Sequence, residues 1–171
     1  MTSLIDVDAA MRDMVEKLKL LCAERNIDKP ALVGIHTGGV WVARRLQSLL
    51  GWDGPVGELD ISFYRDDFTR IGLNPKVKAS SLPFETEGRD VVLVDDVIMS
   101  GRTIRAAMNE LFDFGRPASI LLVALMDVGG RDLPIQPDVV GASRRLESNQ
   151  RVKLLGPAPL AVELREKTGS S

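Results

Sequence analysis

The stretch that decides the fold is VVLVDDVIMSGRT, residues 91–103. It opens with four consecutive apolar residues, three of them β-branched, which predict a strand covered on both faces, as in a parallel sheet. Two carboxylates, Asp95 and Asp96, end this apolar run. The residues that follow predict a helix, because apolar side chains recur there at the spacing of one helical face: Ile104, Ala107, Met108 and Leu111.

The junction between this strand and this helix is a candidate ligand site. Ligands of open α/β sheets bind beyond the carboxyl ends of the strands, and N–H groups at a helix N-terminus hold anions. Gly101 lets the backbone approach closely, while Ser100 and Thr103 offer hydroxyl groups. The acidic pair suits the neighbouring hydroxyls of a ribose. The stretch therefore predicts a sugar-phosphate site; the alternative is a plain strand–loop–helix in which the aspartates cap the helix.

Length and composition set outer limits. One domain, residues 1–171, is expected for a chain of 171 residues. The chain has 22 Lys and Arg against 24 Asp and Glu, and this net charge of -2 gives no global sign of nucleic-acid binding. Cys22 is the one cysteine, so it forms no internal disulfide, and its apolar helical surroundings favour a core position and a cytoplasmic protein. Neither a signal peptide nor a membrane span is expected.

Strands and helices alternate along most of the chain, which predicts an α/β fold with a mainly parallel central sheet flanked by helices. Besides the central stretch, we expect helices over residues 8–25 and 40–50, and strands over residues 31–35, 56–64, 119–126, 139–140 and 152–155. Gly51 is expected to end the helix over residues 40–50, and Gly141 is expected to end the strand over residues 139–140. The C-terminal third is expected to cap the carboxyl edge of the sheet, and residues 160–171 to fray.

Two loops extend the candidate site. Residues 36–39, His-Thr-Gly-Gly, form a second strand–glycine loop–helix junction, which would face the same cleft as the first. His36 is either a ligand contact or a loop histidine that is hydrogen-bonded to its neighbours. Residues 65–78 are polar and broken by glycine and proline, and so long a connection in a compact domain is usually functional or disordered.

At this point the sequence resembles a known family. Residues 91–103 look like the phosphoribosyl-pyrophosphate (PRPP) signature of type I phosphoribosyltransferases, and the likeness to the PyrR family among them runs nearly end to end. Five blocks carry it: residues 32–39 (LVGIHTGG), 57–67 (GELDISFYRDD), 91–103, 115–120 (GRPASI) and 127–135 (DVGGRDLPI).

The resemblance implies both a reaction and a regulatory role. The reaction converts uracil and PRPP to UMP and pyrophosphate with Mg²⁺. The regulatory role is binding of the leader mRNA of a pyrimidine operon in response to UMP or UTP. The resemblance also implies the type I phosphoribosyltransferase fold, with a small C-terminal hood and a flexible loop, and a homodimer or higher homo-oligomer without membrane contact.

The same resemblance assigns residues. The catalytic candidates are Asp95, Asp96 and Arg65, and the two aspartates would also meet Mg²⁺ indirectly, together with PRPP. The expected PRPP and UMP site comprises Thr37, Gly38, Gly39, Asp95, Asp96, Val97, Ile98, Met99, Ser100, Gly101, Arg102 and Thr103. The base would meet Asp127, Val128 and Arg131, and the flexible loop would bring Arg70, Lys76 and Lys78 to pyrophosphate. The candidates for RNA binding are Arg12, Lys19, Arg144 and Arg145, with Arg44, Arg45 and Arg151 as further basic side chains.

Two loops depart from the pattern of well-known members. Thr37-Gly38-Gly39 stands where those members carry Thr-Arg-Gly, which removes a cation from the pyrophosphate site. Residues 127–134, DVGGRDLP, stand where they often carry Asp-Arg-Gly-His-Arg-Glu-Leu-Pro, which alters the loop that faces the base. Two alternatives therefore stay open: a UMP-sensing regulator with little or no catalysis, and a phosphoribosyltransferase for another base.

Overall fold

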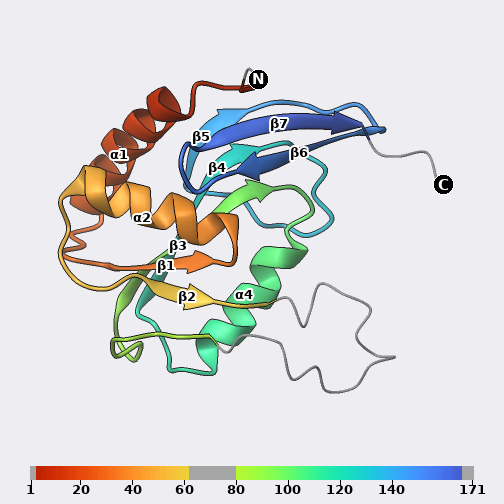
Figure 1. The fold of residues 1–171 in the computed structure, drawn as a ribbon. Coiled ribbons are helices and arrows are strands. Elements are labelled where there is room, and N and C mark those ends of the chain that lie inside the picture. The colour runs from red at the N-terminus through yellow and green to blue at the C-terminus, as the bar shows by residue number, and fades with distance from the viewer. Residues whose placement is uncertain (1–2, 62–79, 167–171) are drawn as a thin grey trace.

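The computed structural model describes residues 3–61 and 80–166 and contains a parallel sheet of five strands in the order β2-β1-β3-β4-β5 (Figure 1). The strands are β1 (Ala31–Ile35), β2 (Gly57–Leu59), β3 (Asp90–Ile98), β4 (Ser119–Asp127) and β5 (Val139–Ser143). All neighbouring strands in this sheet run parallel. The predicted fold class is therefore confirmed.

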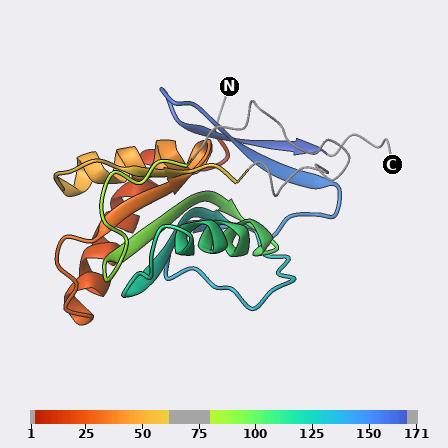
Figure 2. The ribbon, with the colours of Figure 1, turned by 90° about the horizontal axis from the view of Figure 1, so that it is seen from below.

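Helices cover both faces of the sheet (Figures 1 and 2). On one face lie α1 (Val7–Glu24) and α2 (Gly38–Leu50), and on the other lies α4 (Arg102–Phe112). The apolar run of β3 supplies both cores: Val92 and Val94 pack with α1 and α2, and Val91 and Leu93 pack with α4. This double burial explains why residues 91–94 of the strand are all apolar.

The two N-terminal helices begin and end close to where the sequence predicts. The N–H of Ala9 donates to Asp6 Oδ1 at 3.0 Å, so Asp6 caps α1. Cys22 is buried in the core as expected, and burial raises the pKa of its thiol. Gly51 ends α2 with a φ of 69°, a left-handed conformation that favours glycine.

Three predicted element ends are wrong, and for β3 and β5 pairing with strand β4 overrides the local signal. β3 does not stop before the acidic pair, because it stays paired with β4 as far as Ile98 and Asp127. β5 does not end at Gly141 but continues to Ser143. Gly141 lies close to β4, since a Cβ on it would lie 2.7 Å from the backbone oxygen of Leu125. β2 spans only three residues of the predicted strand, and residues 62–64 lie outside the described part of the chain.

The C-terminal residues form a separate antiparallel hairpin of β6 (Gln150–Leu155) and β7 (Ala161–Glu166). The prediction that the chain frays from residue 160 is wrong for residues 161–166. Val162 is buried in the core beside α1 and α2, and its backbone oxygen accepts the Leu4 N–H at 2.7 Å. We call residues 146–166, which include this hairpin, the hood.

The order of the strands locates the ligand crevice. The connection through α2 leaves β1 toward β2, whereas the connection through α4 leaves β3 toward β4. The chain thus departs in opposite directions from two neighbouring strands, and open α/β sheets bind ligands outside the carboxyl ends of strands at such a switch point. No helix in the described ranges is long and apolar enough to cross a membrane.

Candidate functional site

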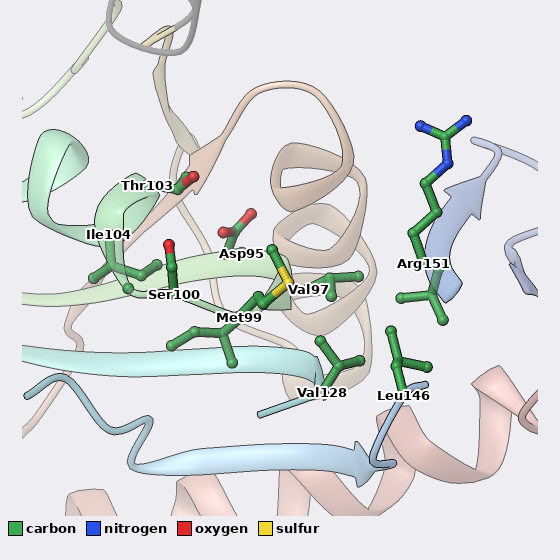
Figure 3. Close-up of a pocket in the computed structure, with 12 residues that line it drawn as sticks. Asp95, Val97, Met99, Ser100, Thr103, Ile104, Val128, Leu146 and Arg151 are labelled. Atoms are coloured by element: carbon green, nitrogen blue, oxygen red, sulfur yellow. The ribbon is translucent and has the colours of Figure 1, made fainter. Parts of the chain in front are cut away.

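A pocket of about 190 Å³ opens at this switch point, beyond the carboxyl end of β3 (Figure 3). One wall is the β3–α4 junction, which contributes Asp95, Val97, Ile98, Met99, Ser100, Gly101, Thr103 and Ile104. The other wall comprises Val128 after β4 and three residues of the hood, Leu146, Arg151 and Val152. The hood therefore covers the carboxyl edge of the sheet, as predicted.

The junction wall has the geometry of an anion site. Gly101 is the N-cap of α4 with a φ of 92°, and a glycine offers no side-chain oxygen to the first-turn N–H groups of the helix. The Arg102 N–H donates to Ser100 Oγ at 3.1 Å. The sequence alternative in which the aspartates cap the helix is wrong, because Gly101 occupies the cap position. The start of α4 can therefore present backbone donors and hydroxyl groups to an anion.

Asp95 lines the pocket, Asp96 follows it beside Gly38, and both carboxylates are held locally. Asp95 is buried, with 2% of its surface exposed, and its Oδ1 accepts the Asp96 N–H at 2.8 Å. Asp96 Oδ1 accepts the Val97 N–H at 2.7 Å. Each carboxylate is thus oriented by the backbone that follows it. Two fixed carboxylates beside an anion site are suited to accept hydrogen bonds from neighbouring hydroxyl groups.

The β1–α2 junction packs directly against this pair. A Cβ on Gly38 would lie 2.2 Å from Asp96 Oδ2, and a Cβ on Gly39 would lie 2.5 Å from the backbone oxygen of Val94. Glycine at both positions is therefore required for the loop to approach β3. In this structure an arginine at residue 38 would therefore require the carboxylate of Asp96 to move.

The loop after β4 is clamped by one arginine. The guanidinium of Arg131 binds both carboxylate oxygens of Asp127, at 2.9 and 2.7 Å, and donates to the backbone oxygens of Met99 and Ile135 at 2.9 and 2.6 Å. Its hydrogen bonds hold the pKa of Asp127 below the usual range. Arg131 therefore ties this loop to the junction wall.

Comparisons with known proteins agree with this geometry. Residues 3–158 match the family model described as the phosphoribosyl transferase domain. The chain is 62% identical over 150 residues to the bifunctional protein PyrR of Pseudomonas paraeruginosa, which covers 88% of this chain and 88% of that protein. It is 56% identical over 164 residues to the bifunctional protein PyrR of Pseudomonas fluorescens, covering 96% and 98%.

The chain belongs to the PyrR family of phosphoribosyltransferases. The predicted family and enzyme class are thus confirmed, and the relatives' name, bifunctional protein PyrR, agrees with the predicted pairing of an enzyme activity with a second role. A hypoxanthine-guanine phosphoribosyltransferase of Bacillus anthracis has the same fold, with a TM-score of 0.67 over 87% of this chain and 85% of that one. Its identity of 17% supports the fold alone.

The structure brings most of the residues predicted from PyrR likeness to one place. The predicted residues of the β1–α2 and β3–α4 junctions meet where Gly38 touches Asp96, and Val128 lines the pocket. Arg102 is exposed and pairs with Asp132 at 3.5 Å. The predictions for Arg65, Arg70, Lys76 and Lys78 lie outside the described residues.

The candidates for RNA binding fall in two places. Arg12 and Lys19 are exposed on α1. Arg144 and Arg145 line a hollow of about 200 Å³ beside Asp127 and Gly129, at the carboxyl end of β5. No metal-ligand group of three or more His, Cys, Asp or Glu occurs within residues 3–61 and 80–166.

Sequence reasoning missed the hood wall of this PyrR-family site. Leu146 and Val152 present apolar side chains to the pocket, and Arg151 was noted only as a basic residue. In Figure 3 the guanidinium of Arg151 extends away from Leu146, to the side toward which the oxygens of Asp95 and Thr103 also point. A signal was present in the alternation of polar and apolar residues from 151 to 154, which places Arg151 on an exposed strand face.

Proposed function

We propose that this chain transfers a phosphoribosyl group from PRPP to uracil, giving UMP and pyrophosphate. The new bond joins uracil N1 to ribose C1′, the bond from C1′ to the pyrophosphate oxygen breaks, and the N1 proton passes to solvent. The observation that carries the proposal is the juxtaposition of a fixed acidic pair, of which Asp95 lines the pocket, with an open helix start in the same pocket wall. A ribose phosphate has the complementary groups at the matching ends.

The shape of the pocket sets the orientation of the nucleotide. The 5′-phosphate would lie on the backbone and hydroxyl groups of residues 99–103, and the ribose hydroxyls on Asp95 and Asp96. The base would then extend toward the hood, where Val97, Val128, Leu146 and Val152 form an apolar surface. Arg151 is the basic side chain at that end of the pocket (Figure 3), and its N–H groups would donate to a carbonyl oxygen of the base.

Catalysis would rest on positioning and electrostatics rather than on a covalent nucleophile. As the C1′–O bond loosens, the ribose acquires positive charge, which the carboxylates of Asp95 and Asp96 stabilise. Asp95 is buried, so its charge is screened less by water than a surface charge would be. The hood covers the reacting sugar and limits attack by water on it.

Mg²⁺ fits this site as a partner of PRPP rather than as a resident metal. The described ranges hold no metal-ligand cluster, but Asp95 and Asp96 supply carboxylate oxygens beside the place proposed for PRPP. When bound, the ion would neutralise charge on the departing pyrophosphate. Asp95 and Asp96 themselves orient the ribose through its hydroxyl groups.

The proposal includes a regulatory role, in which UMP or UTP changes affinity for the leader mRNA of a pyrimidine operon. The relatives' name, bifunctional PyrR, supports it. Arg144 and Arg145 are the stronger RNA candidates, since their hollow adjoins Val128, which also lines the nucleotide pocket. We further propose a cytoplasmic protein that acts as a homodimer or larger assembly.

A base screen tests the enzyme directly. The purified chain is incubated with PRPP and Mg²⁺ and, in turn, with uracil, cytosine, hypoxanthine and guanine, and product nucleotides are separated by chromatography. We expect UMP from uracil alone. Product from a purine but not from uracil would overturn the base assignment. UMP binding without any turnover would instead favour a nucleotide-sensing regulator, and a UMP-dependent, salt-sensitive shift of leader RNA would support that role.

A further inference from the structure

Glu58 on β2 holds two basic side chains from two different elements. Its Oε1 accepts a hydrogen bond from His36 Nε2 at 2.6 Å, and its Oε2 accepts one from Arg44 Nη2 at 2.5 Å. A carboxylate only accepts, so Nε2 of His36 carries the proton in this contact. His36 belongs to the loop before α2, and Arg44 lies on α2 itself. One carboxylate thus joins β2, the β1–α2 loop and α2.

The backbone of Glu58 is fixed from both sides. It pairs with Gly34 of β1 on one edge, and on the other it exchanges two hydrogen bonds of 2.8 Å with Ser81. The side chain is about three-quarters covered, with 24% exposed. Glu58 is therefore a rigid anchor, and a bond to it restrains its partner more than a bond to a mobile surface residue would.

The loop that Glu58 anchors has little freedom to move. The His36 N–H donates to the Leu59 oxygen at 2.9 Å, so backbone and side chain of this residue are both tied to β2. Two residues further on, Gly38 sits so close to Asp96 that a single added carbon would overlap its carboxylate. A shift toward β3 would collide with Asp96, and a shift away would open a gap beside it.

We infer that Glu58 is a positioning residue for pyrophosphate: through His36 it holds the backbone of residues 37–39 in the shape that receives the departing group, while Arg44 balances its charge. The inference rests on the proposed function, together with the family resemblance that assigns pyrophosphate to this loop. It gives His36 a structural purpose that the sequence left open. It also explains how a loop with glycine at residue 38 stays ordered without a side chain of its own to anchor it.

The two partners of Glu58 make different contributions. His36 transmits the position of Glu58 to the loop. Arg44 offsets the negative charge of Glu58, which would otherwise repel an anion at the neighbouring loop. Arg44 is 59% exposed, so its loss leaves little unfilled volume in the core, and its effect on ligand binding is separable from an effect on folding.

The test compares Glu58→Ala, Glu58→Asp and Arg44→Ala with Arg45→Ala as the control. Arg45 is the next residue on α2 and also forms an ion pair, but with Asp8 of α1 at 3.0 Å. Three constants are measured for each variant: the KM for PRPP, the inhibition constant of pyrophosphate against PRPP, and the dissociation constant of UMP by calorimetry. UMP occupies the phosphate, ribose and base positions but not the pyrophosphate position, so it serves as an internal reference.

We expect Glu58→Ala and Arg44→Ala to raise the pyrophosphate inhibition constant and the KM for PRPP about tenfold, which is the usual effect of losing one charge-assisted hydrogen bond. The affinity for UMP should stay within about twofold of the parent value. Glu58→Asp should restore part of the loss, and Arg45→Ala should resemble the parent. Equal weakening of pyrophosphate and UMP, or no weakening of either, would overturn the positioning role. If Glu58→Ala does not fold, Arg44→Ala decides between the same outcomes. A parent protein that binds no UMP would overturn the proposed function itself.

Discussion

The two walls of the pocket are built in different ways. The junction wall lies within residues 95–104, a contiguous stretch of sequence. It presents a carboxylate, two hydroxyl groups and the backbone of a helix start beside the apolar side chains of Val97, Ile98, Met99 and Ile104. The hood wall combines Leu146, Arg151 and Val152 with Val128, and is apolar apart from one guanidinium. A sugar phosphate suits the first wall, and a flat base with polar edges suits the second. One wall therefore anchors the substrate, and the other selects what is attached to it.

The largest expected effect comes from removing the charge of the junction wall. The double substitution Asp95→Asn with Asp96→Asn keeps the side-chain shapes but loses the negative charge that stabilises the reacting ribose. We expect turnover to fall about a thousandfold or more, measured as UMP formed from uracil and PRPP. Asp113→Asn, which neutralises an exposed aspartate at the far end of α4, is the control and should resemble the parent. Near-parental turnover by the double variant would show that the acidic pair does not act on the ribose.

Substitutions in the hood wall should weaken binding of the base and leave binding of the phosphate unchanged. Arg151→Ala is expected to raise the KM for uracil about 10- to 100-fold, because a hydrogen bond from a charged donor is lost, while the KM for PRPP changes little. Lys153→Ala is the matched control, since Lys153 lies two residues along β6 on the same side of the strand but does not line the pocket. A rise in the KM for PRPP alone would assign Arg151 to the junction half of the site.

The glycines that join the β1–α2 loop to the junction wall should separate activity from stability. Gly38→Ala would push the carboxylate of Asp96 aside, and we expect about a tenfold loss of kcat/KM with little change in the Tm. Gly39→Ala would instead meet the backbone of Val94, which cannot rotate away, and should lower the Tm. Steady-state kinetics and thermal unfolding of both variants check this contrast. Equal behaviour of the two would mean that Gly38 does not position Asp96.

The smallest expected effect concerns the clamp that links Val128's loop to the junction wall. The folded-state pKa of Asp127 lies below its unfolded value, so this carboxylate contributes stability that is fully present above the unfolded pKa and is lost as the pH falls through the folded one. Asp127→Asn should therefore cost about 1–3 kcal/mol of unfolding free energy at pH 7 and less at pH 3. Denaturant unfolding at the two pH values measures it. A cost that does not shrink on acidification would show that the charge of Asp127 is not what stabilises the loop.

How much the sequence could predict follows the same division between the walls. The junction wall was predictable in detail because strand, acidic pair, glycine and helix are consecutive, and local patterns report consecutive residues well. The hood wall depends on β6 pairing with β7. The alternation Val162-Glu163-Leu164-Arg165 was a local sign of a strand, but the sequence does not show which segment this strand pairs with. Glu58 was similar: its partners, His36 and Arg44, lie 22 and 14 residues away. Contacts of this kind arise from the tertiary arrangement and have no periodic signature.

Calorimetric titration of the purified chain with UMP and with ribose 5-phosphate, each with Mg²⁺, tests most directly whether a sugar phosphate occupies the β3–α4 junction. We predict that the parent binds both ligands, that Arg151→Ala weakens UMP but not ribose 5-phosphate, and that the Asp95→Asn, Asp96→Asn double variant weakens both. Failure of the parent to bind either ligand, or equal binding by the parent and the double variant, would contradict the site.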